Sequence, residues 1–530
     1  MILLWVMCYN PTVWATIRHV PQDYPTIQAA FDVLSGNDTV WVDSGLYAEA
    51  LIAPPLRFTL LGNVEPDTGA YRRPTIDPSS LPESDTLACL MLPVGCSASI
   101  ERFAFVNHAA MFPRPDTGNY PGGISYFTSD SITIRECLFD SVYGGLVYPT
   151  PTATADLTVE HCLFQNMTNG CVATRGSLQM SDCLIRGHNY AGVGTRYSSI
   201  IERCHFEGDC DTEWLGVYRW DNIVRDCIFG PGTCQWHPLY IYSWGSNRVT
   251  RNVFQEIGLG ESLMYVTLHE GDPVVIDSNV FEDGYMFIYQ SAPIIIYEEP
   301  EAIGSVEVHI SDDWFLRNQG AVPGVEVPKL FSIYTAICPT FLERNRFIAN
   351  TPLEAPVYMV DTAASIHRLS DNAFIHNGDA VYSNYGTLEA SSNYWGDSTG
   401  PYHAGQNPNG RGDSIQGSVD FTPWYPDTSF LMSVPGLGKP LPQAFVFEAY
   451  PNPFNNTVHL RLIPNDIQIV KVELFDMLGR KVKEIWHGPL AFQKDIEFDA
   501  STLASGIYFA RVTNTIFNRP LATAKLVLLK

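Results

Sequence analysis

The chain has 530 residues, of which 45% are hydrophobic and 17% charged, with 32 Lys and Arg against 57 Asp and Glu. The formal charge of −25 argues against a nucleic-acid partner, because phosphate binding requires a basic surface. Abundant Gly, Pro and aromatic residues favour strands and turns, and no membrane span is expected, because no apolar run of about 18 residues occurs beyond the N-terminus.

The first residues predict an export signal. Residues 1–8 are apolar, and Val13-Trp14-Ala15 ends in a small residue, which fits a secretory signal over residues 1–15 with cleavage after Ala15. No basic residue precedes the apolar run, which indicates a shortened start. An apolar N-terminal strand is the alternative interpretation.

Residues 18–62 predict a helix flanked by strands. A short helix is expected from Thr26, its cap, to Leu34, and a strand over Thr39–Val42. Residues 20–30 (VPQDYPTIQAA) and 45–49 (GLYAE) resemble the entry of pectin-lyase-like right-handed β-helix proteins, including pectin methylesterases. The resemblance implies a helix that covers the open end of the first coil, so that this edge recruits no other chain.

A repeated pattern organises the middle of the chain. A strand with period-two alternation, such as Ile132 and Ile134, precedes a Cys or Asn, and a Phe follows two residues later. The spacing between copies varies from 21 to 34 residues. The repeated positions are Phe103, Cys137, Cys162, Cys183, Cys204, Cys227, Asn252, Asn279, Asp313, Asn345, Asn372 and Asn393. Each repeat predicts one coil of a parallel β-helix, since a coil buries its apolar side only against its neighbours.

The change from Cys to Asn along the repeat predicts an internal ladder. Equivalent residues of stacked coils lie about 4.8 Å apart, and a buried Asn can donate to one neighbour and accept from another. Cys fills the same position as a small apolar residue, so the five repeat cysteines are expected to be buried thiols. Disulfides or a metal site are the alternatives, and Cys89–Cys96 and Cys210–Cys234 are the disulfide candidates in an exported chain.

The end of the repeat has its own motifs. Residues 393–397 (NYWGD), 400–401 (GP) and 417–424 (GSVDFTPW) resemble the closing segment of secreted right-handed β-helix repeats. We therefore expect an all-β chain in which residues 16–425 form a right-handed parallel β-helix of about a dozen coils. Asp397 and Asp413 offer oxygen ligands that calcium accepts, but a polar turn is favoured and no cofactor is expected.

The C-terminal residues predict a second domain after a linker over residues 426–444. Residues 445–530 alternate short strands with turn signals, as a small immunoglobulin-like sandwich does. Residues 450–455 (YPNPFN), 506–508 (GIY) and the final Lys530 resemble the type A C-terminal sorting domain of the type IX secretion system. The resemblance implies export across the outer membrane of a Gram-negative cell, with this domain as the partner of the secretion machinery.

Catalytic motifs of pectin-lyase-like enzymes are largely missing. Only residues 45–49 match the methylesterase pattern, and the ordered carboxylate motifs of polygalacturonases do not occur. An acidic group and two arginines on preceding coils remain as catalytic candidates without a family motif. These candidates are Asp209, Asp211, Glu213, Arg175 and Arg196.

A surface of arginines and aromatics is predicted when the second strands of successive coils are aligned. If Val172, Val193, Val217, Ile241 and Val266 point inward, the first and third residues after each point outward. Those outward residues are Ala173, Arg175, Gly194, Arg196, Tyr218, Trp220, Tyr242, Trp244, Thr267 and His269, with Tyr289 and Tyr334 as continuing positions. The predicted ligand-binding residues among them are Arg175, Arg196, Tyr218, Trp220, Tyr242, Trp244 and His269. Such a surface suits stacking on sugar rings, with Arg binding a carboxylate or sulfate.

Two functions remain open at this point. The first is a non-catalytic secreted or cell-surface protein that binds carbohydrate or another extracellular surface. The second is a polysaccharide lyase or glycoside hydrolase that acts on acidic polysaccharide along the predicted surface. In both cases we expect a polysaccharide or cell-surface glycan as partner and a monomeric protein.

Overall fold

Two compact units make up the computed structural model, one within residues 1–428 and one over residues 429–530. The structure describes residues 15–64, 73–82, 88–107, 122–147, 153–188, 192–259, 262–286, 292–298, 306–320, 331–334, 338–350, 357–359, 367–432, 445–463, 468–477, 479–490, 494–514 and 519–530. The expected signal falls almost wholly outside these residues, as do residues 433–444 of the expected linker.

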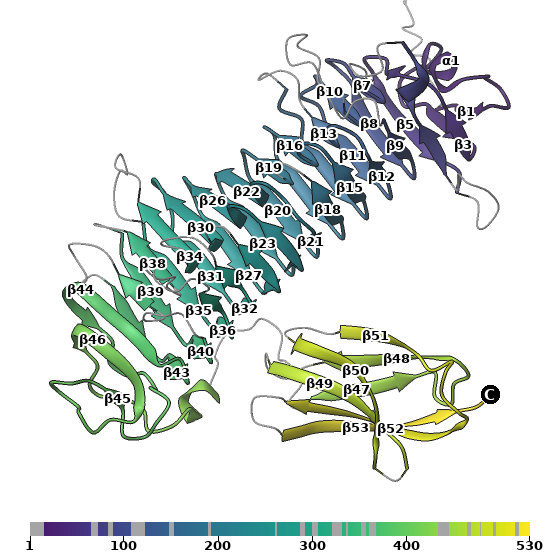
Figure 1. Ribbon diagram of the computed structural model, residues 1–530. Coiled ribbons are helices and arrows are strands. Elements are labelled where there is room, and N and C mark those ends of the chain that lie inside the picture. Colours follow the sequence, from purple (N-terminus) through teal and green to yellow (C-terminus); the bar gives the residue numbers. More distant parts are fainter. Residues whose placement is uncertain are drawn as a thin grey trace, which may run out of the picture. The chain divides into compact units, whose positions relative to one another are not determined.

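The first unit begins with a short helix against the first coil (Figure 1). Helix α1 (Ile27–Phe31) ends earlier than expected, and the Thr26 hydroxyl accepts the Ala29 N–H as predicted. The Glu49 carboxylate accepts the N–H groups of Ile27 and Gln28 at 3.0 and 2.9 Å. The residues that carry the N-terminal resemblance are thus joined by hydrogen bonds.

The first unit is a parallel β-helix whose coils form three faces, called sheets 1, 2 and 3 (Figure 1). Sheets 1 and 3 join through β44 (Asp379–Glu389), which pairs with a strand of each. Sheet 1 contains β1 (Ile17–Val20), β2 (Thr39–Val42), β5 (Arg57–Gly62), β8 (Ser97–Glu101), β11 (Ile132–Arg135), β14 (Leu157–Glu160), β17 (Leu178–Ser181), β20 (Ser199–Glu202), β23 (Asn222–Arg225), β27 (Asn247–Thr250), β31 (Val274–Asp277), β35 (Val308–Ser311), β39 (Thr340–Glu343) and β42 (Arg368–Ser370). Sheet 2 contains β3 (Gly45–Tyr47), β6 (Pro74–Ile76), β9 (Ala104–Val106), β12 (Leu138–Asp140), β15 (Leu163–Met167), β18 (Leu184–His188), β21 (His205–Glu207), β24 (Ile228–Phe229), β28 (Val253–Gln255), β32 (Val280–Glu282), β36 (Trp314–Leu316), β40 (Arg346–Ile348) and β43 (Ala373–Ile375).

Sheet 3 completes the coils and carries the predicted surface. It contains β4 (Leu51–Ile52), β7 (Leu90–Leu92), β10 (Ile124–Tyr126), β13 (Leu146–Val147), β16 (Val172–Thr174), β19 (Val193–Thr195), β22 (Glu213–Arg219), β26 (His237–Ser243), β30 (Ser262–Leu268), β34 (Ala292–Glu298), β38 (Phe331–Tyr334), β41 (Val357–Met359), β44 (Asp379–Glu389), β45 (Pro401–Tyr402) and β46 (Gly412–Asp420). A short additional sheet precedes it in four coils, with β25 (Gly232–Cys234), β29 (Ile257–Leu259), β33 (Tyr285–Met286) and β37 (Gln319–Gly320). Short 3₁₀ turns lie at Pro78–Ser80 and Ser429–Met432.

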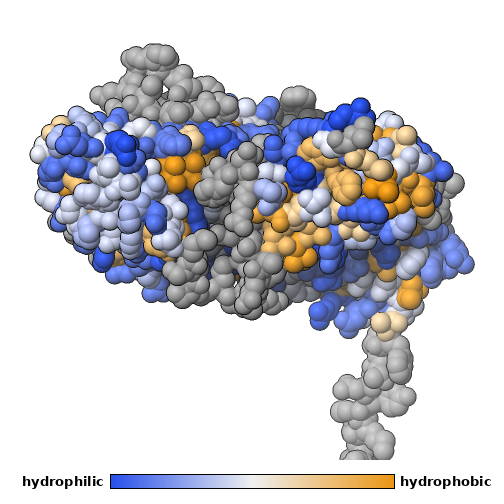
Figure 2. All heavy atoms as spheres, turned by 90° about the horizontal axis from the view of Figure 1, so that it is seen from below, coloured by the Kyte–Doolittle hydropathy of each residue, from blue (hydrophilic) through white to orange (hydrophobic). Residues whose placement is uncertain are grey.

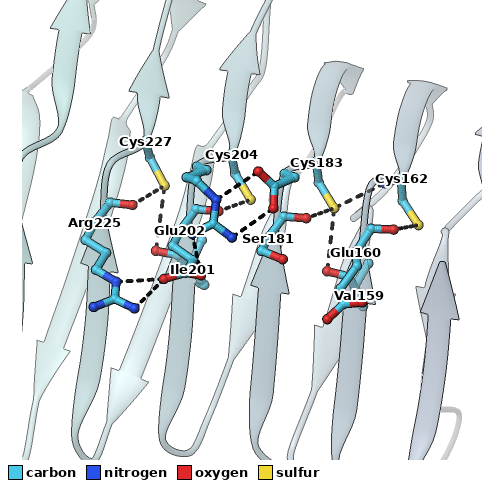
Figure 3. A network of polar contacts seen from close by, with 12 residues as sticks. Val159, Glu160, Cys162, Ser181, Cys183, Ile201, Glu202, Cys204, Arg225 and Cys227 are labelled. Carbon is cyan, nitrogen blue, oxygen red and sulfur yellow. Dashed lines mark hydrogen bonds and ion pairs between the residues drawn. The ribbon is translucent and has the colours of Figure 1, made fainter. Parts of the chain in front are cut away.

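The predicted ladder lies between sheets 1 and 2 and is confirmed. Its cysteines are buried free thiols, and Figure 3 shows four of them in file. At the change of residue type, the Cys227 N–H donates to Asn252 Oδ1 at 2.9 Å, and Asn252 donates to Asn279 Oδ1 from its N–H and its Nδ2. The aromatic rings two residues later stack in register, for example Phe139 on Phe164 with centroids 4.7 Å apart.

A second ladder at the next corner of the coil was missed by the sequence analysis. Asn318, Asn350 and Asn377 are buried, and each Nδ2 donates to the side chain of the next coil. The buried Asp413 carboxylate ends this ladder by accepting from Asn377 at 2.8 Å. Asp413 therefore has a structural role, whereas Asp397 Oδ1 accepts from the Thr399 N–H and hydroxyl in a turn.

Ion pairs join neighbouring coils on the outside of the first ladder. The residue before each ladder position has a positive φ, and at several coils these residues pair, as Arg203 does with Asp182 at 2.8 Å and Arg251 with Asp226 at 2.6 Å. Arg225 contacts Glu202 on the adjacent strand in the same way (Figure 3). Much of the basic charge of the β-helix is thus used within its own corners.

The second unit consists of two antiparallel sheets around a separate core. One sheet contains β47 (Val446–Tyr450), β48 (Thr457–Ile463) and β51 (Lys494–Asp499), and the other contains β49 (Gln468–Phe475), β50 (Lys481–Leu490), β52 (Gly506–Asn514) and β53 (Arg519–Leu528). Both sheets supply buried residues to one cluster, including Leu460 and Val472. This arrangement is the small β-sandwich that the sequence predicts.

Candidate functional site

The candidate site lies on the outer side of sheet 3, over β16, β19, β22, β26 and β30. The expected register is wrong at one step, because Val193 pairs with Leu215 and not with Val217. Strand β22 has seven residues whereas β19 has three, and both Leu215 and Val217 are buried. The shift is two residues, so the outward face is kept and only the alignment along the strands changes.

The corrected register changes which outward residues are neighbours. Thr195 pairs with Val217, and so the next residue, Arg196, aligns with Tyr218 and not with Trp220. Tyr218 pairs with Tyr242, which pairs with Thr267. Thr267 is buried because Tyr240 covers it, with the two hydroxyls 3.2 Å apart. Tyr334 lies in β38 opposite Tyr297, and Tyr289 lies outside the described residues.

Tyr218 and Glu213 form a hydrogen-bonded pair at one side of the surface. The Tyr218 hydroxyl donates to Glu213 Oε1 at 3.0 Å. Its ring lies over Gly216, where a Cβ would come within 2.9 Å of a ring carbon, so the small residue is required there. Burial raises the pKa of Glu213, and burial followed by the charge of Glu213 raises that of Tyr218. Arg196 is near enough for its charge to oppose the rise in the Tyr218 pKa.

A group of rings that the sequence analysis did not select continues from this pair. Tyr240 packs edge-on against Tyr218 with centroids 5.5 Å apart, and Tyr265 packs against Tyr240 at 5.8 Å. His237 lies 4.6 Å from Tyr265, contacts the Ser262 hydroxyl at 2.9 Å, and has its pKa lowered to about 3 by burial. The signal was available, because Tyr240 lies one residue before the inward Ile241 and period two sends it outward.

Trp244 is enclosed between two neighbours. The His269 ring stacks on it at 4.0 Å with an interplanar angle of 9°, and the Arg219 guanidinium lies 5.3 Å from its centroid. These neighbours come from the following and the preceding coil, so both faces of Trp244 are occupied. Trp220 meets Trp244 edge-on at 6.4 Å and keeps 42% of its surface exposed. Of the two tryptophans, Trp220 is the one with an open ring.

The arginines and carboxylates that the sequence predicts on this surface lie in different environments. Arg196 is exposed, Arg175 is half-buried, and Arg196 and Arg219 form no ion pair with a carboxylate in the described part of the chain. Asp209 accepts from the Thr233 N–H and hydroxyl, and Asp211 from Gln235. These two carboxylates thus hold a loop to the next coil. Within the described ranges, no three His, Cys, Asp or Glu side chains are arranged to hold a metal ion.

Comparison with known families agrees with this architecture. Residues 122–281 match the family model of the right-handed β-helix region, and residues 448–527 match that of the secretion system C-terminal sorting domain.

The chain contains a right-handed β-helix region and a C-terminal sorting domain of the type IX secretion system. No curated protein matches it. The match to the β-helix family spans all five strands of the candidate site, and the fold of pectin-lyase-like proteins is compatible with it.

The sorting domain determines where this β-helix protein acts. It directs export through the type IX secretion system, so the protein is secreted or held on the outer surface of a Gram-negative cell. The secretion machinery is therefore one of its partners. In the described part of the chain, no helix has the length and apolar character that crossing a bilayer requires.

Proposed function

We propose that the protein binds carbohydrate outside the cell through sheet 3, without cleaving it. The observation that carries this proposal is the open ring of Trp220, which meets Trp244 edge-on and shares its face of the β-helix with the exposed side chains of Arg219 and Arg196. An exposed indole offers a flat apolar face to the C–H groups of a sugar ring. The rings of Tyr242 and His269, whose centroids are 6.3 Å apart, lie against Trp244 on the same face.

The cations favour an acidic saccharide as the ligand. The β-helix is strongly acidic overall, which repels polyanions at long range. At physiological ionic strength this repulsion is screened beyond about 8 Å, whereas a guanidinium in direct contact with a carboxylate or sulfate is not. Local contacts with Arg196 and Arg219 therefore decide the preference.

The test measures the binding of the wild type and of two tryptophan variants to an array of acidic and neutral oligosaccharides. Trp220→Ala should weaken binding by about tenfold, since a stacked aromatic contributes on the order of 1 kcal/mol or more. Trp236→Ala is the matched control, because Trp236 is 55% exposed at the opposite end of β26. Equal affinities of the two variants, or no glycan bound by the wild type, would contradict the proposal.

The Glu213–Tyr218 pair supports cleavage of acidic polysaccharide as a second candidate. A carboxyl and a phenol within one hydrogen bond, near an arginine, are groups that general acid–base catalysis uses. The exported protein should then release reducing ends or unsaturated products from acidic polysaccharides, and Tyr218→Phe should abolish this turnover. Binding without turnover in the wild type favours the first proposal.

A further inference from the structure

Cys210 and Cys234 lie side by side on adjacent coils, outside the cysteine ladder. They form an isolated parallel bridge, and the Cys210 Sγ is 3.0 Å from the Cys234 Sγ. Both side chains are buried, with exposed fractions of 4% and 1%. Backbone bonds hold this register, because the Cys210 N–H donates to Thr233 O and the Gln235 N–H donates to Cys210 O.

The ladder thiols make different contacts. Cys162 Sγ, for example, donates to the backbone carbonyls of Glu160 and Ile134 at 3.3 and 3.8 Å. Cys234 Sγ likewise donates to a carbonyl, Thr212 O at 2.8 Å, whereas the Cys210 thiol donates to the Cys234 sulfur, and the structure holds both residues as thiols. Directly opposed residues of neighbouring parallel strands have the Cα separation that a disulfide accepts.

We propose that Cys210 and Cys234 form a disulfide in the exported protein. Export takes the chain through an oxidising compartment, where disulfides form and persist. The two S–H bonds are replaced by one S–S bond, and two electrons and two protons pass to a disulfide-bonded oxidoreductase, which becomes a dithiol. The proposal rests on export and is independent of the proposed carbohydrate binding.

The bond would join the two strands that carry most of the candidate site. Cys210 lies three residues before β22 and Cys234 three residues before β26, and Glu213 pairs with His237 at the start of these strands. A covalent link here fixes the spacing of β22 and β26 at their N-terminal ends, and Trp220 and Trp244 directly follow the C-terminal ends of the same strands. Pre-organisation of this kind lowers the entropy lost when a ligand binds.

Peptide mapping of the full exported chain tests the proposal. The protein is denatured without reductant, alkylated, and digested with chymotrypsin, which cuts after Phe206 and Phe229 and so separates each cysteine of the pair from its ladder neighbour. We expect one linked peptide pair that contains Cys210 and Cys234, while the five ladder cysteines are alkylated. Alkylation of both cysteines, or a link from either to another residue such as Cys171, would overturn the proposal.

Two variants extend this test. Cys234→Ser should leave Cys210 fully alkylated, and Cys227→Ser, which removes a ladder thiol seven residues away in the same coil, should retain the linked peptide. Loss of the link in Cys227→Ser, with Cys210 alkylated, would show that the pair does not bond independently of the ladder.

Discussion

At the residue scale, Asp313 stands at a position of the first ladder that otherwise suits Asn. Its Oδ1 accepts from the N–H and Nδ2 of Asn279, and its own N–H donates to Asn345 Oδ1 at 3.0 Å. Its buried Oδ2 has no partner in the described chain, whereas the Nδ2 of Asn345 donates to a carbonyl, Ile310 O. Burial raises the pKa of Asp313 well above its ordinary value, so the fold favours the protonated acid, which can donate as an amide does.

We therefore expect Asp313→Asn to stabilise the protein at neutral pH by about 1–3 kcal/mol, because the amide donates at any pH, whereas the buried acid must first take up a proton or stay unsatisfied. Because the folded-state pKa is raised, the folded state binds more protons than the unfolded one above pH of about 4, and the stability due to Asp313 falls as pH rises toward the folded pKa. Urea unfolding of the wild type and of Asp313→Asn at acidic and neutral pH measures the difference in their free energies of unfolding. An advantage of the Asn variant that is the same at both pH values would contradict the explanation.

At the element scale, the sequence predicted the coil positions better than their lateral alignment. Each ladder position was identifiable because a strand, a turn and a Phe surround it, and the rings stack accordingly. The register of β22 was not identifiable from the sequence, because Leu215 and Val217 both satisfy the inward pattern. The Arg219 guanidinium that lies over Trp244 belongs to a residue with a φ of 79°, a backbone conformation that no spacing rule indicates.

The second ladder had a signal that was overlooked. Asn318, Asn350 and Asn377 each follow a first-ladder residue by five positions. Two buried polar residues at this constant offset mark the two corners of one coil, since each needs a partner on the next coil.

The asparagine half of the first ladder should be harder to replace than the cysteine half. Asn345→Ala removes the donor to Ile310 O and Asn372 Oδ1 and the acceptor of the Asp313 N–H, at about 1–3 kcal/mol for each buried group left unsatisfied. Cys204→Ala removes one weak donor, to Glu202 O. Chemical denaturation should show the larger loss of stability for Asn345→Ala. An equal or smaller loss would mean that the amide bonds do not hold the ladder.

At the scale of the whole molecule, charge and hydrophobic core divide the chain in the same place. Residues 445–530 hold 10 Lys and Arg and 8 Asp and Glu, a net of +2, so the rest of the chain carries −27. The buried cluster of the β-helix and that of the sandwich share no residue. On the face drawn in Figure 2, hydrophobic patches lie among residues that are mostly hydrophilic. Export and the proposed binding are therefore assigned to parts of the chain that have separate cores.

Deletion of residues 448–527 should separate these two roles. Without the sorting domain the protein should be retained inside the cell envelope, absent from the medium and the cell surface, because the match to the secretion system lies entirely in that segment. The β-helix should keep its thermal unfolding midpoint, since its core loses no residue. Immunoblots of cell fractions and calorimetry of the retained protein measure the two effects, with full-length Trp220→Ala as the export control. Secretion of the shortened chain would place the export address elsewhere, and a lowered midpoint would show that the β-helix depends on the sandwich for stability.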